Sequence, residues 1–203
     1  MLLAARCAIC GRSGASPCAD CHRGLRPPSP EPDPPGLDGL VALLRYDGPA
    51  RPLVARIKYR NERRAVSWLA DGLAARLAAV AGDVVTWAPT TPEHRRGRGF
   101  DHGEVLARAV ARRLRLPARA LLRRADGPAQ TGRPAHERLA GGPSFSLLRP
   151  LPAGTHVLLV DDVVTTGATL RAASRALTRA PGIVVTPVTA AWTPSPRGRR
   201  DAA

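Results

Sequence analysis

Residues 156–170 read HVLLVDDVVTTGATL, and this stretch of the 203-residue chain says most about its fold and chemistry. The apolar run Val157–Val160 predicts a buried strand, which ends in two adjacent carboxylates, Asp161 and Asp162. A hydroxyl-rich turn follows, and the apolar spacing of Leu170–Arg179 predicts a helix. Strand, polar turn and helix in this order are typical of an α/β fold with a parallel sheet.

The turn and the helix start have the chemistry of a phosphate site. The first N–H groups of a helix lack intrahelical partners and the helix dipole is positive there, so an open N-terminus binds phosphate. Carboxylates just upstream accept hydrogen bonds from sugar hydroxyls or hold a hard cation such as Mg²⁺. Together these groups indicate a ribose 5-phosphate site. Its candidate residues are Val160, Asp161, Asp162, Thr165, Thr166, Gly167, Ala168 and Thr169.

An ordinary buried strand with a capped turn is the alternative. Two consecutive acids at the end of an apolar strand argue against it, because a buried unpaired charge costs on the order of several kcal/mol. The segment also resembles the signature of the type I phosphoribosyltransferases, which bind 5-phosphoribosyl 1-diphosphate (PRPP). This resemblance implies that Asp161 and Asp162 are catalytic, orienting the ribose hydroxyls with Mg²⁺ held indirectly, and that the threonine-rich turn wraps the 5′-phosphate.

All four cysteines lie near the N-terminus, in two C-x-x-C pairs separated by seven residues. This spacing suits a closed tetrahedral zinc site with a structural role. The alternatives are disulfides or free buried thiols, and His22 is a neighbour that could substitute as a ligand. The predicted zinc ligands are Cys7, Cys10, Cys18 and Cys21.

The composition of the chain bears on its cellular location and on nucleic-acid binding. No run of about 18 apolar residues is present, which predicts no membrane span, and the start is a poor signal peptide, so we expect a cytoplasmic location. The net charge of +15 invites nucleic-acid binding, but the basic residues are almost all arginines, many on helix faces. Aromatic residues make up only 3% of the chain, which leaves little for base stacking.

Four regions follow from the pattern along the chain. We expect a zinc ribbon at 1–26, a stiff proline-rich linker at 27–38, a parallel-sheet α/β domain at 39–192 and a disordered basic tail at 193–203. The residues Gly127–Pro143 are polar and aperiodic, which predicts a mobile loop. The expected strands are Leu40–Tyr46, Val84–Pro89, Arg119–Leu122, His156–Asp161 and Ile183–Ala191, and the expected helices are Val66–Ala81, His102–Leu116 and Thr169–Arg179.

A second polar segment, Pro89–Phe100, follows another predicted strand. Its arginines can bind phosphate oxygens in bidentate fashion, and its glycines allow close backbone approach. Lys58 is the only lysine in the chain, in which all other basic side chains of this kind are arginines. A lysine at this position suggests that the site needs a compact ammonium group. A chance occurrence is an equally weighted alternative. The candidates for binding pyrophosphate are therefore Lys58, Arg95 and Arg98.

The order of these features is similar to the ComF family of competence-associated phosphoribosyltransferase-like proteins. The chain departs from that family at Asp101, His102 and Ala140, where the family usually has asparagine, glutamine and asparagine. These departures do not affect the residues that match the PRPP-binding motif. They affect the regions expected to contact pyrophosphate and the acceptor. The matching pieces are the C-x-x-C pairs, Tyr46-Asp47-Gly48, Ile57-Lys58-Tyr59, Pro89, Arg95–Phe100, Gln130, Arg138, Phe145 and VDDVVTTGATL.

The resemblance implies a type I phosphoribosyltransferase fold with a small zinc ribbon, and transfer of phosphoribosyl to an unknown acceptor with release of pyrophosphate. Gln130–Arg138 would close as a lid. His102 and His136 are candidate bases, but a histidine in a polar loop is more often a bystander. The alternative is a non-catalytic component of DNA uptake or processing that binds single-stranded DNA or a helicase-like partner. A third hypothesis, ranked lower, is a structural zinc protein whose acidic turn binds only metal. The oligomeric state stays open, with a homodimer as one candidate.

Overall fold

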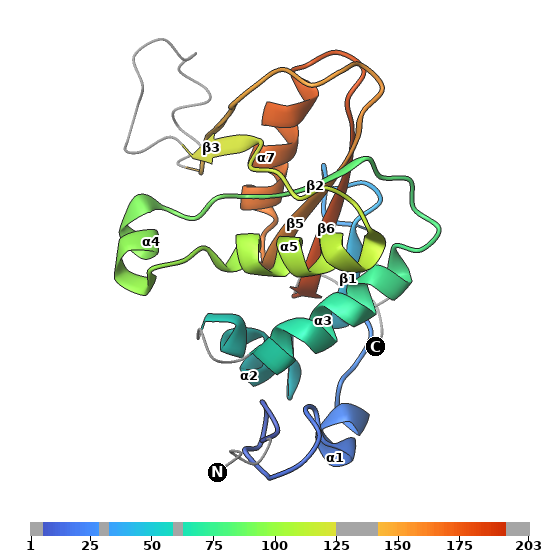
Figure 1. Ribbon diagram of the computed structural model, residues 1–203, viewed down its shortest axis with the longest axis vertical. Coiled ribbons are helices and arrows are strands. Elements are labelled where there is room, and N and C mark those ends of the chain that lie inside the picture. The colour runs from blue at the N-terminus through green and yellow to red at the C-terminus, as the bar shows by residue number, and fades with distance from the viewer. Residues whose placement is uncertain (1–5, 29–32, 59–62, 125–141, 194–203) are drawn as a thin grey trace, which may run out of the picture.

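A four-stranded parallel sheet forms the centre of the protein (Figure 1). The computed structural model describes residues 6–28, 33–58, 63–124 and 142–193. Within them the strand order is β1-β6-β5-β2, and all three neighbouring pairs run parallel. The expected parallel α/β fold is confirmed. The strands are β1 (Val41–Arg45), β2 (Val84–Trp87), β5 (His156–Val164) and β6 (Val184–Trp192).

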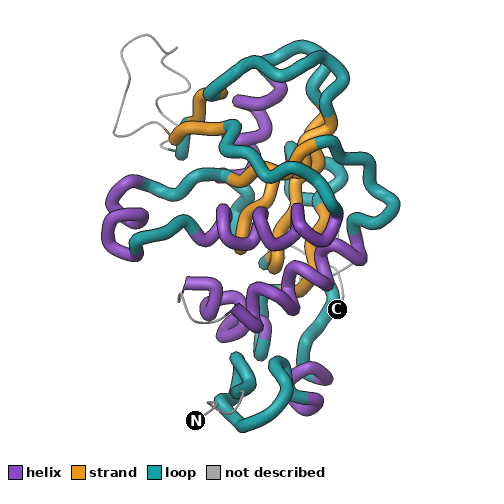
Figure 2. The backbone as a smooth tube through the Cα atoms, viewed as in Figure 1, coloured by secondary structure: helices purple, strands orange, loops and turns teal. Residues whose placement is uncertain are grey.

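Helices cover both faces of this sheet (Figure 2). Helices α3 (Arg63–Arg76) and α5 (His102–Leu114) lie on one face, while α7 (Ala168–Thr178) packs on the other. The antiparallel hairpin of β3 (Leu122–Arg124) and β4 (Phe145–Leu147) joins the core on the α7 side. The sheet is therefore buried on both faces, as the continuous apolar runs of its strands predict.

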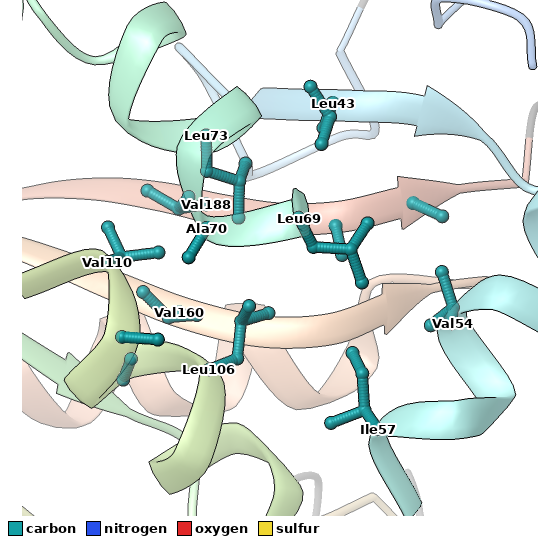
Figure 3. Packing of buried hydrophobic residues seen from close by; sticks show 14 of the residues in the cluster. Leu43, Val54, Ile57, Leu69, Ala70, Leu73, Leu106, Val110, Val160 and Val188 are labelled. Carbon is teal, nitrogen blue, oxygen red and sulfur yellow. The ribbon is translucent and has the colours of Figure 1, made fainter. Parts of the chain in front are cut away.

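Strand β5 shows how the sequence assigns side chains to the two faces. Leu158 and Val160 belong to the core under α3 and α5, whereas Val157 and Leu159 belong to the core under α7. This alternation follows from the two-residue repeat of a strand. Figure 3 shows Val160 beside side chains from both covering helices in the first of these cores.

Short elements complete the described part of the chain. Helix α1 (Ala19–Arg23) begins after Cys18 and contains Cys21, and α2 (Ala50–Ala55) runs into the 3₁₀ turn η1 (Arg56–Lys58). Helix α4 (Pro92–Arg98) lies between β2 and α5. None of the helices within the described ranges is long and apolar enough to cross a lipid bilayer.

The structure corrects the expected elements in two places near the ligand residues. Strand β5 does not stop at Asp161, because its pairing with β6 continues to Val164 opposite Trp192. The segment after β2 was expected to be a loop, yet Pro92–Arg98 is helical. Its polar sequence has no apolar face, so periodicity gives no sign of this short helix.

Candidate functional site

Asp161 and Asp162 lie where the sheet divides. Pairing between β5 and β2 ends with Val160 opposite Trp87, while pairing between β5 and β6 continues past both acids. Each carboxylate accepts the backbone N–H of the following residue through its Oδ1 atom, at 2.9 Å in both cases. Ligands of parallel sheets bind in the crevice at the carboxyl ends of the strands. Both acids therefore occupy the position that a ligand site requires.

Burial and a neighbouring negative charge disfavour the ionised form of the Asp161 carboxyl group. Burial raises its pKa well above the ordinary value, and the charge of the adjacent Asp162 raises it further, with a smaller contribution from Asp101. A cation or a set of hydroxyl donors at this position would offset the repulsion between the two carboxylates. The pair therefore has the donor chemistry that Mg²⁺ or a ribose diol would complement.

The hydroxyl-rich turn connects the acids directly to the N-terminus of α7. Thr165 and Thr166 are exposed, and the Oγ1 atom of Thr166 accepts a weak hydrogen bond from the Ala168 N–H at 3.4 Å. Gly167 is the N-cap residue, with φ of 76° and no side-chain cap. The first turn of α7, which includes Thr169, contains no acidic residue. Since no carboxylate neutralises this helix N-terminus, it is electrostatically suited to an external anion.

Asp101 organises the second polar segment. It is only 5% exposed and caps α5 by accepting the N–H groups of Gly103 at 3.0 Å and Glu104 at 3.4 Å. Its other oxygen accepts the N–H of Thr90 at 2.8 Å. The acid that replaces the family's usual asparagine thus fixes the loop after β2 against α5.

A cavity of about 390 Å³ opens beside this loop. Arg95 lines it from α4, and Arg123 and Arg124 line it from β3. Arg124 also donates to the Pro89 carbonyl at 3.4 Å, which connects the hairpin to the loop after β2. The remaining lining residues are Trp87, Pro89, Thr90, Pro92, Asp101, Glu104, Ala120, Leu122 and Leu148.

Of the three residues predicted to bind pyrophosphate, only Arg95 has a described side chain. Lys58 ends η1 and Arg98 ends α4, and their side chains lie outside what the structure describes. Gln130, His136 and Arg138 also lie outside the described residues. His102 is 6% exposed, its ring 5.1 Å from the ring of Phe100. No local pattern in the sequence indicates Arg123 and Arg124, which lie on β3 where it pairs with β4.

The four cysteines form one cluster, as their spacing predicts. Their sulfur atoms all lie within 4.8 Å of one another, and those of Cys10 and Cys18 are 3.7 Å apart. Tetrahedral zinc with bonds of about 2.3 Å requires sulfurs about 3.8 Å apart, so the cluster fits this metal. Burial opposes ionisation of Cys7, but backbone N–H groups of Cys10, Cys18 and Ile9 favour the thiolate and its pKa falls to about 6.

This cluster is packed against the α/β domain. Ala8, between the first two cysteines, is 2% exposed and belongs to the core under α3 and α5. Its carbonyl accepts a hydrogen bond from Arg56 Nε at 3.1 Å, and the His22 ring lies edge-on to Trp68 of α3 at 5.8 Å. The four cysteines are thus joined to the same folded unit as the sheet.

Comparison with known proteins agrees with this geometry. Residues 101–201, which include β5, the turn and α7, match the family model of the phosphoribosyl transferase domain. This part of the chain is similar to phosphoribosyl transferase domains. It is also 26% identical over 179 residues to the competence protein ComFC of Bacillus subtilis (strain 168), a match covering 84% of this chain and 70% of that protein. The predicted resemblance to the ComF family is confirmed.

Solved structures of similar shape include two phosphoribosyltransferases. The purine phosphoribosyltransferase of Pyrococcus horikoshii is 17% identical, with 63% of this chain and 73% of that chain covered and a TM-score of 0.41. The adenine phosphoribosyltransferase of Thermoanaerobacter pseudethanolicus is 16% identical, with coverage of 68% and 69% and a TM-score of 0.43.

Proposed function

We propose that this protein binds PRPP and transfers its phosphoribosyl group to an acceptor with release of pyrophosphate. The observation that carries the proposal is the continuity of the acidic pair, the threonine turn and the open N-terminus of α7 within the matched domain. These groups would meet, in chain order, the ribose diol and the 5′-phosphate of one ligand.

The 5′-phosphate would bind at the start of α7. Thr165, Thr166 and Thr169 would donate through their hydroxyls, and the N–H groups of Thr166–Ala168 would donate from the backbone. These donors belong to one turn and one helix end, so most are fixed in place before the ligand arrives. Preorganised donors lose little entropy on binding, which favours affinity for a small anion.

Pyrophosphate would lie on the side of the loop after β2. Arg95, Arg123 and Arg124 line the cavity there, and arginine suits phosphate oxygens because its fork donates two parallel hydrogen bonds. Lys58 and Arg98 remain further candidates. Trp87, which lines this cavity, pairs across the sheet with Val160, the residue just before the acidic pair.

Chemically, a nucleophilic atom of the acceptor would attack C1 of the ribose. The bond from C1 to the pyrophosphate oxygen would break, and its electron pair would leave with pyrophosphate. Asp161 and Asp162 would orient the ribose hydroxyls, and their negative charge would stabilise the positive charge that develops on the sugar. Mg²⁺, when bound near these two acids, would neutralise charge on the leaving group.

The cysteine cluster would have a structural role. Four thiolates close a tetrahedral zinc site and leave no position for substrate, so catalysis at this metal is not expected. Its packing on Arg56 and Trp68 suggests that it supports the region around η1 and α3.

Calorimetric titration of PRPP with and without Mg²⁺ tests this function. We expect Mg²⁺-dependent binding by the wild type and its loss in Asp161→Asn and in Asp162→Asn. Asp83→Asn is a matched control, because Asp83 accepts the N–H of His156 at the opposite end of β5. Absence of Mg²⁺-dependent binding by the wild type would refute the proposal.

Pyrophosphate release across a panel of nucleobases tests the catalytic step. Release with one base would name the acceptor. PRPP binding without release would instead support the non-catalytic hypothesis, in which single-stranded DNA or a helicase-like protein is the partner. Sedimentation of the same sample would decide between monomer and homodimer.

A further inference from the structure

A short segment outside the sheet packs on the phosphate turn. Residues 33–40, here named the strap, overlap the end of the segment 27–38 that was expected to be a stiff linker. The carboxylate of Asp33 accepts the N–H groups of Gly39 at 2.7 Å and Leu40 at 3.2 Å, so the strap is closed by its own hydrogen bonds. Leu37, at its centre, is 1% exposed and belongs to the core under α7. The strap is therefore a folded part of the domain.

The contact between Leu37 and Gly167 is the closest part of this packing. Gly167 has φ of 76°, and a Cβ atom added to it would lie 2.7 Å from Cδ1 of Leu37. That distance is too short for two carbon atoms, so the leucine side chain occupies the space next to the glycine backbone. Only glycine fits this place, both for its conformation and for its neighbour.

Arg171 holds the strap from the other side. Its Nη1 atom donates to the Pro35 carbonyl at 3.2 Å, and a Cβ atom on Gly36 would lie 3.2 Å from its Cδ atom. The same Nη1 atom lies 2.9 Å from the position of a Cβ on Gly167. Arg171 and Leu37 thus both contact the residue that begins α7.

The carbonyl of Gly167 accepts the N–H of Arg171 at 2.9 Å, but no side chain caps the helix start at this residue. Its backbone conformation sets the direction of the Ala168 N–H group, one of the backbone donors proposed to bind the 5′-phosphate. A residue with φ above zero and no side chain has wide freedom unless neighbours restrict it. The strap supplies that restriction.

We infer that Leu37 is a positioning residue for the phosphate turn: by packing on Gly167 it keeps the N-terminus of α7 in its anion-binding geometry. This inference rests on the proposed function, since the anion is the 5′-phosphate of PRPP. Leu37 is not among the residues proposed to bind PRPP, and its proposed effect passes through its contact with Gly167. The proline-rich segment would then have a function in binding beyond joining two parts of the chain.

Two leucine-to-alanine variants separate positioning from stability. Leu177 is 0% exposed and lies in the same core as Leu37, but at the opposite end of α7. We expect Leu37→Ala to weaken Mg²⁺–PRPP binding about tenfold, because small misplacements of ligand groups have effects of this size or larger. Leu177→Ala should lose comparable stability and keep the wild-type Kd within about twofold. Leu37→Met, which restores the volume, should recover most of the affinity.

A double-mutant cycle with Gly167→Ala tests the contact itself. Gly167→Ala alone should weaken binding strongly, and the added Leu37→Ala should weaken it further by much less than tenfold, because the steric conflict between the two side chains is then gone. Hydrogen exchange should also show faster exchange at the Ala168 and Thr169 amides in Leu37→Ala, but not in Leu177→Ala.

These measurements separate the two claims. If the wild type binds PRPP and Leu37→Ala binds equally well, or if Leu177→Ala weakens binding as much, the positioning role is overturned and the proposed function stands. If the wild type does not bind PRPP, the proposed function fails, and the inference fails with it.

Discussion

The Oδ2 atom of Asp101 accepts a hydrogen bond from the backbone N–H of Thr90 at 2.8 Å. Because the other oxygen of the same carboxylate caps α5, one side chain fixes both the helix start and the loop that lines the arginine-rich cavity. This double role explains why an acid is compatible with a position where ComF-type proteins usually have asparagine.

Replacing Asp101 should separate its two roles. Asp101→Ala should lower the free energy of unfolding by about 1–2 kcal/mol, the usual cost of losing a helix N-cap. Asp101→Asn should lose less, because its single carbonyl oxygen can still accept from one side but not from both. Urea denaturation measures the three proteins. Equal losses in the two variants would contradict the double role.

Asp161→Asn should stabilise the protein at neutral pH while removing Mg²⁺-dependent PRPP binding. The pKa of Asp161 is raised in the folded state, chiefly by burial, so its ionisation costs folding free energy. That cost is absent below the unfolded pKa of about 3.9 and grows as the pH rises through the higher folded pKa. At pH 8 we expect a melting temperature about 2–4 °C above wild type, the effect of ~1 kcal/mol in a domain of this size.

The pH dependence is the control for this stabilisation. The difference in melting temperature between Asp161→Asn and wild type should shrink as the pH is lowered toward 4. A difference that is independent of pH would show that the amide stabilises the fold for some reason other than charge.

Arg95→Ala should weaken pyrophosphate binding about tenfold, the effect of losing one hydrogen bond to a charged group. Arg96→Ala is the matched control, because Arg96 lies next to it on α4, pairs with Glu93 at 3.5 Å and is absent from the cavity lining. Inhibition by added pyrophosphate, or direct calorimetry, measures the effect. Equal effects of the two variants would indicate general charge attraction and no defined site.

Metal analysis should find one zinc ion per chain. Cys7→Ser should lose the metal and lower the melting temperature, because the cluster packs into the main core through Ala8. His22→Ala should retain the zinc, since the four cysteines complete the coordination. Loss of zinc from the histidine variant would instead make His22 a ligand.

The sequence predicted the fold through features that are local in the chain, and the proposed acidic site rests on the same features. The apolar run before Asp161, the helix after Gly167 and the cysteine spacing are each contained in a short segment. The extension of β5 to Val164 depends on β6 continuing beside it, which no local pattern reports. Arg123 likewise enters the cavity only through pairing with a strand that follows 125–141.

The burial of Leu37 also depends on a contact that is distant in sequence and that no local pattern predicts. A single leucine among prolines, glycines and aspartates has no apolar periodicity, so composition alone predicts an exposed linker. Its burial comes from a contact with Gly167, which lies far along the chain. The proline-rich composition therefore predicts a linker but does not predict that the segment packs against the start of α7.

The burial of Ala8, between the first two cysteines, couples the stability of the main core to the metal content of the cysteine cluster. Since this residue closes part of the core that also holds α3 and α5, release of the metal would loosen the wall of the enzyme-like domain as well as the cysteine loop. If zinc fills this cluster, the amount of folded protein in a cell should follow the availability of zinc.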